Sequence, residues 1–173
     1  VRGATSTVGL AAIQIAKAMG ATVIASSRSD TSFEKLKAVG ADYCVVDDGN
    51  IAAQMTDALR PNKVLELIGP ATLKDTFAHT SEGGIVCSTG QLGGEWYLNG
   101  FEPIMELPAN GYLTSFYSGN VDPGRMQEML DFVRQYDVNI APERVFSLEE
   151  VPLAHEYLDS SHSFGKCVVV VGP

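Results

Sequence analysis

The sequence has few charged residues, and basic residues are the scarcer kind. Only 19% of its 173 residues are charged, and 12 Lys and Arg stand against 21 Asp and Glu, which gives a formal net charge of −9. Nucleic acids and anionic membrane surfaces are bound by basic patches. The acidic excess therefore favours neither a nucleic-acid partner nor a membrane partner.

Long apolar runs and cysteine pairs are also lacking. Hydrophobic residues make up 45% of the chain, but no run reaches the roughly 18 apolar residues of a membrane span, so a globular domain is expected. The cysteines Cys44, Cys87 and Cys167 lie far apart in apolar, strand-like stretches. This is typical of buried thiols in a reducing compartment and not of a disulfide framework or a C-x-x-C metal pair. We therefore expect a cytoplasmic protein.

What the sequence does contain is a regular alternation of short apolar strands and helices. The alternation with short turns predicts right-handed crossovers and a parallel sheet covered on both faces. The expected fold class is therefore α/β, a Rossmann-type doubly wound parallel sheet. The expected strands are 21–26, 43–46, 63–68, 85–89 and 112–117, and the expected helices include 8–19, one capped by Asn50 that reaches Leu59, and one that begins at Pro70 and reaches about His79.

The first strand is represented only by Val1-Arg2-Gly3, from which we expect the sequence to be a fragment of a longer chain. A turn of small residues follows and leads into a helix. Laid over the dinucleotide fingerprint G-x-G-x-x-G, Ala4, Ser6 and Gly9 retain only the last glycine. Backbone amides and the helix dipole at such a turn can meet a pyrophosphate. The turn alone also fits an ordinary strand-to-helix connection without a ligand.

Four segments follow the carboxyl ends of expected strands. In a doubly wound sheet, ligands bind outside these ends, at the point where the strand order reverses. We therefore expect the four turns to meet at one edge of the sheet and to form a nucleotide site. The candidate residues are Ala4, Thr5, Ser6, Thr7 and Val8 in the first turn, Ser26, Ser27 and Arg28 in the second, Ile68 and Gly69 in the third, and Thr89, Gly90, Gln91 and Leu92 in the fourth.

The second turn discriminates between cofactors. An NAD-type site places an acidic residue about 20 residues beyond the glycine turn, whereas an NADP-type site needs polar and cationic groups for the 2′-phosphate. Here the strand ends in Ser26-Ser27-Arg28-Ser29, and the first acid, Asp30, is displaced toward the next helix. Hydroxyl groups around a guanidinium suit a phosphate dianion. The sequence thus favours NADP(H), with a merely solvated Arg28 as the alternative.

Catalytic groups cannot be assigned from the sequence. His79, His155 and His162 have no partner at metal-ligand spacing, so no metal site is expected. Ser88 lacks the G-x-S-x-G context of a hydrolase nucleophile. The catalytic residues are therefore unknown at this stage.

Four segments in the same order resemble a known family. They are the turn and helix of residues 3–17, similar to an A-x-x-G-x-x-G turn; Gly40-Ala41-Asp42, similar to G-A-D; Gly83-Gly84, similar to G-G-x-x; and the closing segment 145–169. Together they resemble the cofactor domain of the medium-chain dehydrogenase/reductase superfamily, and within it the zinc-independent, quinone oxidoreductase-like branch. The resemblance covers nearly the whole chain.

The resemblance implies two parts. Residues 1–137 would be an NADP-binding Rossmann domain, and residues 138–173 would be a C-terminal strand–helix–strand segment that packs on an N-terminal catalytic domain absent from this sequence. The family commonly dimerises by strand pairing next to residues 112–117, so a homodimer through the Tyr112–Tyr117 strand is expected.

The resemblance also implies roles for individual residues. Residues 5–8 would line the pyrophosphate and Arg28 the adenosine 2′-phosphate. Ser6 stands where the branch usually has glycine, and its hydroxyl would then bond the phosphate. The residues at the nicotinamide end would be Gly90, Gln91, Leu92, Phe116, Tyr117 and Ser118.

These features predict the cofactor-binding domain of an NADPH-dependent reductase that transfers hydride to a quinone or conjugated carbonyl compound. The chain by itself would bind nucleotide and be nearly inactive. Two alternatives remain open. One is a zinc-dependent alcohol dehydrogenase whose metal site lies in the missing N-terminal part, and the other is a non-catalytic nucleotide-binding or redox-sensing module.

Overall fold

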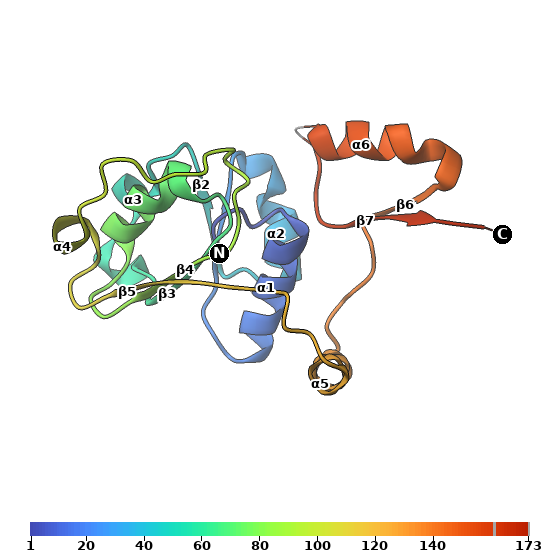
Figure 1. Ribbon diagram of the computed structural model, residues 1–173, viewed down its shortest axis with the longest axis horizontal. Coiled ribbons are helices and arrows are strands. Elements are labelled where there is room, and N and C mark those ends of the chain that lie inside the picture. The colour runs from blue at the N-terminus through green and yellow to red at the C-terminus, as the bar shows by residue number, and fades with distance from the viewer. Residues whose placement is uncertain (161, 173) are drawn as a thin grey trace.

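Short parallel strands and the helices between them form the larger part of the molecule (Figure 1), as a computed structural model shows for residues 1–160 and 162–172. One group pairs β1 with β2, and another has the order β3-β4-β5, with every pairing parallel. The strands are β1 Ile24–Ser27, β2 Tyr43–Val46, β3 Lys63–Glu66, β4 Ile85–Ser88 and β5 Tyr112–Ser115.

The N-terminal residues 1–4 lie between these two groups and join them. The amide of Arg2 donates to the carbonyl of Leu65 at 2.9 Å, and the amide of Ala4 donates to the carbonyl of Ser26 at 3.1 Å. The resulting order across the sheet is β2, β1, residues 1–4, β3, β4, β5. The chain first adds β1 and β2 on one side of residues 1–4 and then adds β3, β4 and β5 on the other side, so the strand order reverses at residues 1–4. This is the expected doubly wound Rossmann arrangement, and the α/β fold class is confirmed.

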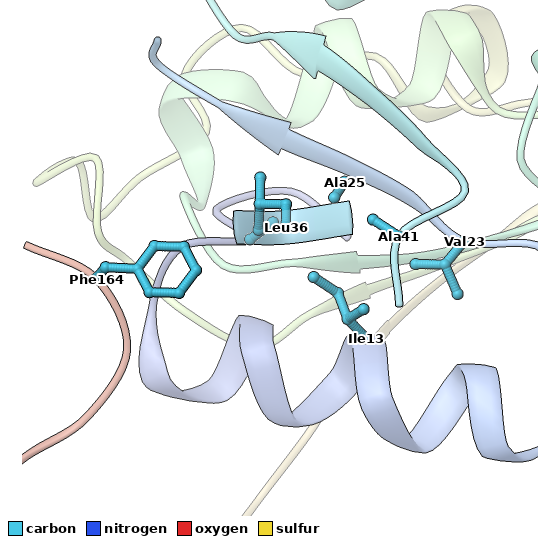
Figure 2. Packing of buried hydrophobic residues seen from close by; sticks show 7 residues of the cluster. Ile13, Val23, Ala25, Leu36, Ala41 and Phe164 are labelled. Carbon is cyan, nitrogen blue, oxygen red and sulfur yellow. The ribbon is translucent and has the colours of Figure 1, made fainter. Parts of the chain in front are cut away.

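Helices cover the sheet through two hydrophobic clusters. Ile13 of α1 and Leu36 of α2 pack with Ala25 of β1 in the first cluster (Figure 2). Phe77 of α3 packs with Val86 of β4 in the second. The helices of this part are α1 Thr7–Ala18, α2 Phe33–Val39, α3 Pro70–His79 and the short α4 Pro103–Glu106. Helix α3 begins at Pro70 and ends at His79, as the sequence predicts.

The prediction of a helix that is capped by Asn50 and reaches Leu59 is wrong. The segment instead forms two short 3₁₀ turns, at Ile51–Gln54 and Asp57–Leu59. Within the described residues, the Asn50 side chain caps neither of them. The carboxylate of Asp75 accepts from the amides of Ile51 and Ala52 at 3.0 and 3.1 Å. The start of this segment is therefore held by a residue of α3 and not by a local cap.

The C-terminal residues form a separate strand–helix–strand unit after α5 Pro123–Gln135 (Figure 1). It consists of β6 Arg144–Ser147, α6 Val151–Asp159 and β7 Cys167–Val170, with β6 and β7 parallel. Ser147 and Glu150 form a capping box at the helix start. Phe164 buries its ring in the α1–α2 cluster. This unit is therefore anchored to the helices α1 and α2 that pack on β1.

Candidate nucleotide-binding site

The turn before α1 is shaped to bring a ligand close to the start of the helix. A Cβ at Gly9 would lie 2.6 Å from the carbonyl oxygen of Ala4, so only glycine permits this approach of helix and strand. Thr7 and Val8 are the first residues of α1 and are exposed. In the described part of the chain, their amides have no partner. These exposed amides and the positive end of the helix dipole suit an anionic group.

Ser6 uses its hydroxyl within the turn. The hydroxyl donates to the carbonyl of Gly3 at 2.9 Å and accepts from the amide of Gly9 at 3.1 Å, which makes Ser6 the N-cap of α1. Its proton therefore does not point to a phosphate in this structure. Ser6 acts as a cap that keeps the turn tight, and the hydroxyl–phosphate bond expected from the resemblance would require this proton to leave Gly3.

In the second turn, the serines are buried and Arg28 is exposed. The Ser26 hydroxyl accepts from the amide of Gly3 at 3.3 Å and donates to the carboxylate of Asp47 at 3.1 Å. This side chain therefore links the start of the first turn to Asp47. The Ser27 hydroxyl accepts from the amide of Ser29 at 3.4 Å. Of the three candidate residues of this turn, Arg28 is therefore the one that is exposed and can reach a ligand.

The third and fourth turns interlock. A Cβ at Gly69 would lie 2.7 Å from the carbonyl oxygen of Gly90, and a Cβ at Gly90 would lie 2.5 Å from that of Leu67. The amides of Leu92 and Gly93 donate to the carbonyls of Leu67 and Ile68 at 3.0 and 2.8 Å. The two turns thus pack together as one unit beyond β3 and β4. We call this unit, residues 67–69 and 90–93, the ledge.

This ledge meets the first turn at Gly3. A Cβ there would lie 3.1 Å from Cδ1 of Ile68 and 3.5 Å from Cδ1 of Leu92. The structure therefore brings residues of all four predicted turns around Gly3, since Ser26 also bonds its amide. Phe116 and Tyr117 follow β5 with side chains 64% and 77% exposed. They lie at the same edge of the sheet, and their contact with a cofactor stays a prediction, as does that of Ser118.

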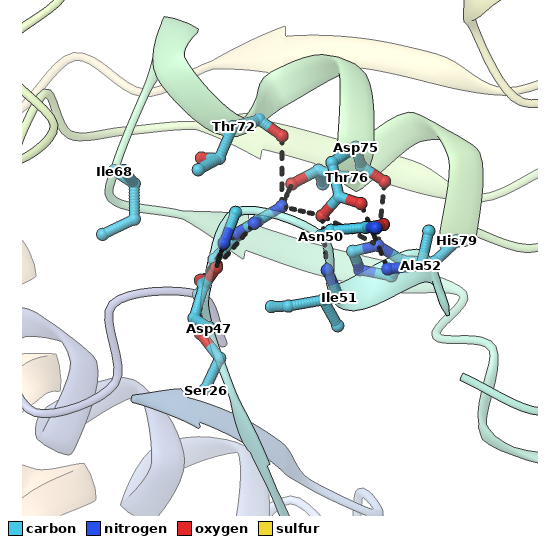
Figure 3. Close-up of polar contacts among 12 residues, drawn as sticks. Ser26, Asp47, Asn50, Ile51, Ala52, Ile68, Thr72, Asp75, Thr76 and His79 are labelled. Atoms are coloured by element: carbon cyan, nitrogen blue, oxygen red, sulfur yellow. Dashed lines mark hydrogen bonds and ion pairs between the residues drawn. The ribbon is translucent and has the colours of Figure 1, made fainter. Parts of the chain in front are cut away.

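A buried charge network lies beneath these turns and was missed by the sequence reasoning (Figure 3). Arg2 donates to both carboxylate oxygens of Asp47, at 2.8 and 2.7 Å, and to Asp75 at 2.7 Å. Its Nε lies 3.9 Å from an oxygen of Glu66. A signal was present, because an arginine inside a buried strand needs acidic partners. Asp47 and Glu66, at or just after strand ends, are suitable ones.

The charges in this network stabilise one another. Burial works to raise the pKa of Asp47, but the hydrogen bonds and charge of Arg2 outweigh burial and hold that pKa below its ordinary value. The carboxylates likewise outweigh burial at Arg2 and raise its pKa. Burial lowers the pKa of the neighbouring His79. At neutral pH the guanidinium is therefore charged and His79 is neutral.

The C-terminal unit also contacts the first turn. The amide of Gly165 donates to the carbonyl of Thr5 at 2.8 Å, and the Thr7 hydroxyl donates to the carbonyl of Gly165 at 3.0 Å. Nothing in the sequence pattern near Gly165 predicts this contact. The turn is thus held by residues from both ends of the chain.

A cavity of about 890 Å³ opens toward the opposite edge of the sheet, where its lining includes Met19, Val23, Tyr43, Met55 and Pro61, which precede or begin strands. Its lining also includes Arg2 and Ser26, so it reaches inward to the residues beneath the first turn. Across residues 1–160 and 162–172, no group of three or more His, Cys, Asp or Glu side chains could hold a metal ion. Among the same residues, none of the helices combines the length and apolarity needed to cross a bilayer.

Comparison with known proteins defines the class. The chain matches the zinc-binding dehydrogenase family over residues 7–135. It belongs to this family, and the expected membership of the medium-chain dehydrogenase/reductase superfamily is confirmed. The matched region runs from the first residue of α1 to the last residue of α5.

Individual relatives show how much of such proteins the chain represents. It is 26% identical over 174 residues to a zinc-type alcohol dehydrogenase-like protein of Schizosaccharomyces pombe, covering 96% of this chain and 50% of that protein. A crystal structure of an NAD-dependent alcohol dehydrogenase is 26% identical with a TM-score of 0.80, over 99% of this chain and 50% of that one. The Escherichia coli quinone oxidoreductase complexed with NADPH is 20% identical with a TM-score of 0.77, over 98% and 55%. The chain thus spans about half the length of these relatives.

Proposed function

We propose that the chain is the cofactor-binding domain of an NADPH-dependent reductase that delivers hydride to a quinone or another conjugated carbonyl compound. The observation that carries the proposal is the convergence of four turns around Gly3, at the reversal of the strand order. The NADPH bound to the Escherichia coli quinone oxidoreductase, which has the same fold, supports it.

The preference for NADPH rests on Arg28. This side chain is exposed at the end of β1, and the hydroxyls of neighbouring Ser29 and Thr31 bond each other at 3.0 Å. A guanidinium can bind a phosphate through several donors. A relative described as NAD-dependent has the same fold, so the cofactor must be tested directly. Fluorescence titration of the chain with NADPH and with NADH is expected to show tighter binding of NADPH. Equal or tighter binding of NADH would refute the preference.

The residues around the site fit a dinucleotide. Bound NADPH would supply the hydride. The amides of Thr7 and Val8 would bind the pyrophosphate, and Gly9 allows the close approach of strand and helix that places them. The side chains of Ile68 and Leu92 form an apolar boundary next to Gly3, which would exclude water from the bound cofactor.

The substrate-binding part is proposed to lie in the half of the protein that this chain does not represent. Residues 138–172 would then pack on that catalytic domain, consistent with the exposed side chains of Leu148, Leu153 and Leu158. A protein that contains both halves is expected to oxidise NADPH in the presence of quinones or enones, whereas the 173-residue chain would be nearly inactive.

A zinc-dependent alcohol dehydrogenase is the second candidate. The S. pombe relative is described as zinc-type, and the family as zinc-binding. Such a metal site would have to lie outside the described residues, which hold no suitable cluster. Metal analysis of a protein that contains both halves distinguishes the two functions. One tightly bound zinc ion per chain would favour the dehydrogenase.

We further propose a cytoplasmic homodimer formed through β5. This strand is at the edge of the order β3-β4-β5, and all four of its residues are exposed. An exposed parallel edge strand offers unpaired backbone groups for pairing with a second copy. Sedimentation at micromolar concentration is expected to give the mass of a dimer, and a monomer would contradict this assembly.

A further inference from the structure

Glu66 is a fully buried carboxylate at the junction of the turns. It is the last residue of β3, and its exposed fraction is 0%. A buried carboxylate is tolerated only when its oxygens are hydrogen-bonded or paired with a cation. The partners of Glu66 therefore show what this side chain does.

The two carboxylate oxygens bind different parts of the chain. Oε1 accepts from the amides of Ile68 and Gly69, at 2.8 and 3.3 Å. Oε2 accepts from the hydroxyl of Thr76 on α3 and lies 3.9 Å from Nε of Arg2. The carboxylate thus sets the path of the chain between β3 and α3, and it links that path to the strand that carries the first turn.

The main chain of Glu66 contacts the fourth turn as well. Its carbonyl accepts from the amides of Thr89 and Gly90, at 2.9 and 3.2 Å. Because Gly69 and Gly90 are packed without room for a side chain, a shift of one turn displaces the other. Glu66 therefore controls the shape of the whole ledge.

The ledge and Arg28 lie on opposite sides of the central strand. Arg28 follows β1, on one side of residues 1–4, whereas Ile68 and Gly90 follow β3 and β4, on the other. A dinucleotide whose pyrophosphate lies at the start of α1 extends across this strand. With the adenosine 2′-phosphate at Arg28, the nicotinamide half falls on the ledge.

We propose that Glu66 is a positioning residue for the nicotinamide half of the dinucleotide, an inference that rests on the proposed function. Its carboxylate holds the Ile68–Gly69 turn against the Gly90–Gly93 turn in the shape that this half requires. The adenosine half, which lies on the β1 side, does not depend on Glu66.

Two ligands separate this role from a general effect on folding. NADPH contacts both sides of the central strand, whereas adenosine 2′,5′-bisphosphate contains only the adenosine half. In Glu66→Gln, an NH₂ group replaces one carboxylate oxygen. This NH₂ group faces either the backbone amides of Ile68 and Gly69, or the Thr76 hydroxyl and Arg2, and in both orientations it meets groups that donate to the carboxylate in the wild-type chain. We expect the affinity for NADPH to fall about tenfold, the equivalent of one lost charge-assisted hydrogen bond. The affinity for the bisphosphate should stay within about twofold, a change too small to reflect a lost hydrogen bond.

Asp75→Asn is the matched control, because Asp75 is another acidic partner of Arg2 that contacts Ile51 and Ala52 instead of the ledge. This variant is expected to bind both ligands as the wild-type chain does. If Glu66→Gln does not fold, as judged by circular dichroism, Thr76→Val takes its place. It removes the hydroxyl that donates to the carboxylate and accepts from Arg2, and it keeps the charge of Glu66. We expect a selective, several-fold loss of NADPH affinity.

Equal losses for both ligands, or no loss for either, would overturn the role of Glu66 while leaving the proposed function intact. Failure of the wild-type chain to bind either ligand would instead overturn the proposed function, and the role of Glu66 with it. Selective loss of NADPH in the Asp75→Asn control would also contradict the proposal, because the effect would then belong to the whole charge network.

Discussion

Arg28 is the residue whose contribution can be isolated most cleanly. It is exposed, and among the described residues its guanidinium makes no hydrogen bond or ion pair, so we expect its removal to leave the fold unchanged. Arg28→Ala is expected to weaken NADPH binding by about tenfold, since a charge-assisted hydrogen bond to the 2′-phosphate is lost. NADH lacks that phosphate and should bind as before. Titration of both cofactors measures this, with Arg60→Ala at the opposite edge as control, and equal losses for the two cofactors would remove Arg28 from the phosphate site.

His79 makes stability depend on pH. Burial lowers its pKa, so the folded protein keeps the imidazole neutral at a pH where the unfolded chain, with a pKa of about 6.5, already binds a proton. Stability should therefore fall as the pH drops below about 6.5, until the lower pKa of the folded state is reached. Urea unfolding between pH 7 and pH 5 measures the loss. His79→Asn, whose amide can donate to the carbonyl of Asp75 as Nδ1 does, should flatten the profile, and an unchanged slope would contradict this origin.

Single residues also show the limit of what the sequence predicts. Arg28 and the small residues of the first turn could be predicted, because their neighbours in sequence define the turn. For the network of Arg2, Asp47 and Glu66, the sequence indicates only that a buried arginine needs acidic partners; it does not show which ones, because Arg2 and Asp47 are 45 positions apart. The hydroxyls of Ser6 and Ser26 were expected to face the ligand, yet they bond the chain itself.

At the scale of elements, the start of α1 is the part of the candidate site whose structure is determined by residues close together in the sequence. Ser6 caps the helix, and replacement by alanine is expected to cost about 1 kcal/mol, whereas glycine at the same position costs only a few tenths. For a chain of this size, 1 kcal/mol lowers the melting temperature by about 2–4 °C. Calorimetry of Ser6→Ala and Ser6→Gly tests the order, and a larger loss for glycine would show that the cap does not act as described.

Elements with local signals were predicted best. Pro70 begins α3, as the sequence predicts, and Ser147 with Glu150 forms a capping box at the start of the C-terminal helix. The helix expected after Asn50 failed, because the local sequence competes with the distant carboxylate of Asp75.

At the scale of the whole molecule, Phe164 ties the C-terminal unit to the sheet. Its ring is only 7% exposed and lies in the cluster of α1 and α2. Phe164→Ala is expected to destabilise the chain by about 3–5 kcal/mol and to release the C-terminal unit. Denaturant unfolding and limited proteolysis measure both effects. Phe146→Ala, which removes a partly buried ring inside that unit, is the control, and resistance of the Phe164 variant to proteolysis after residue 137 would contradict the anchoring role.

We propose that the nucleotide binds where the strand order reverses, and the sequence predicted such a doubly wound parallel sheet from the alternation of strands and helices. The division at residue 137 stays a prediction, because the C-terminal unit contacts the first turn through Gly165 as well as having a sheet of its own. The two ends of the chain therefore shape one site together.

Hydrogen exchange with and without NADPH tests the central claim most directly, since it locates the bound cofactor on the chain. We predict slower exchange at the amides of Thr7 and Val8 and at residues 26–29 and 89–93. The opposite edge, including the cavity at Met19, Met55 and Pro61, should remain unchanged. Protection confined to that opposite edge, or no protection at saturating NADPH, would contradict the assignment of the nucleotide site.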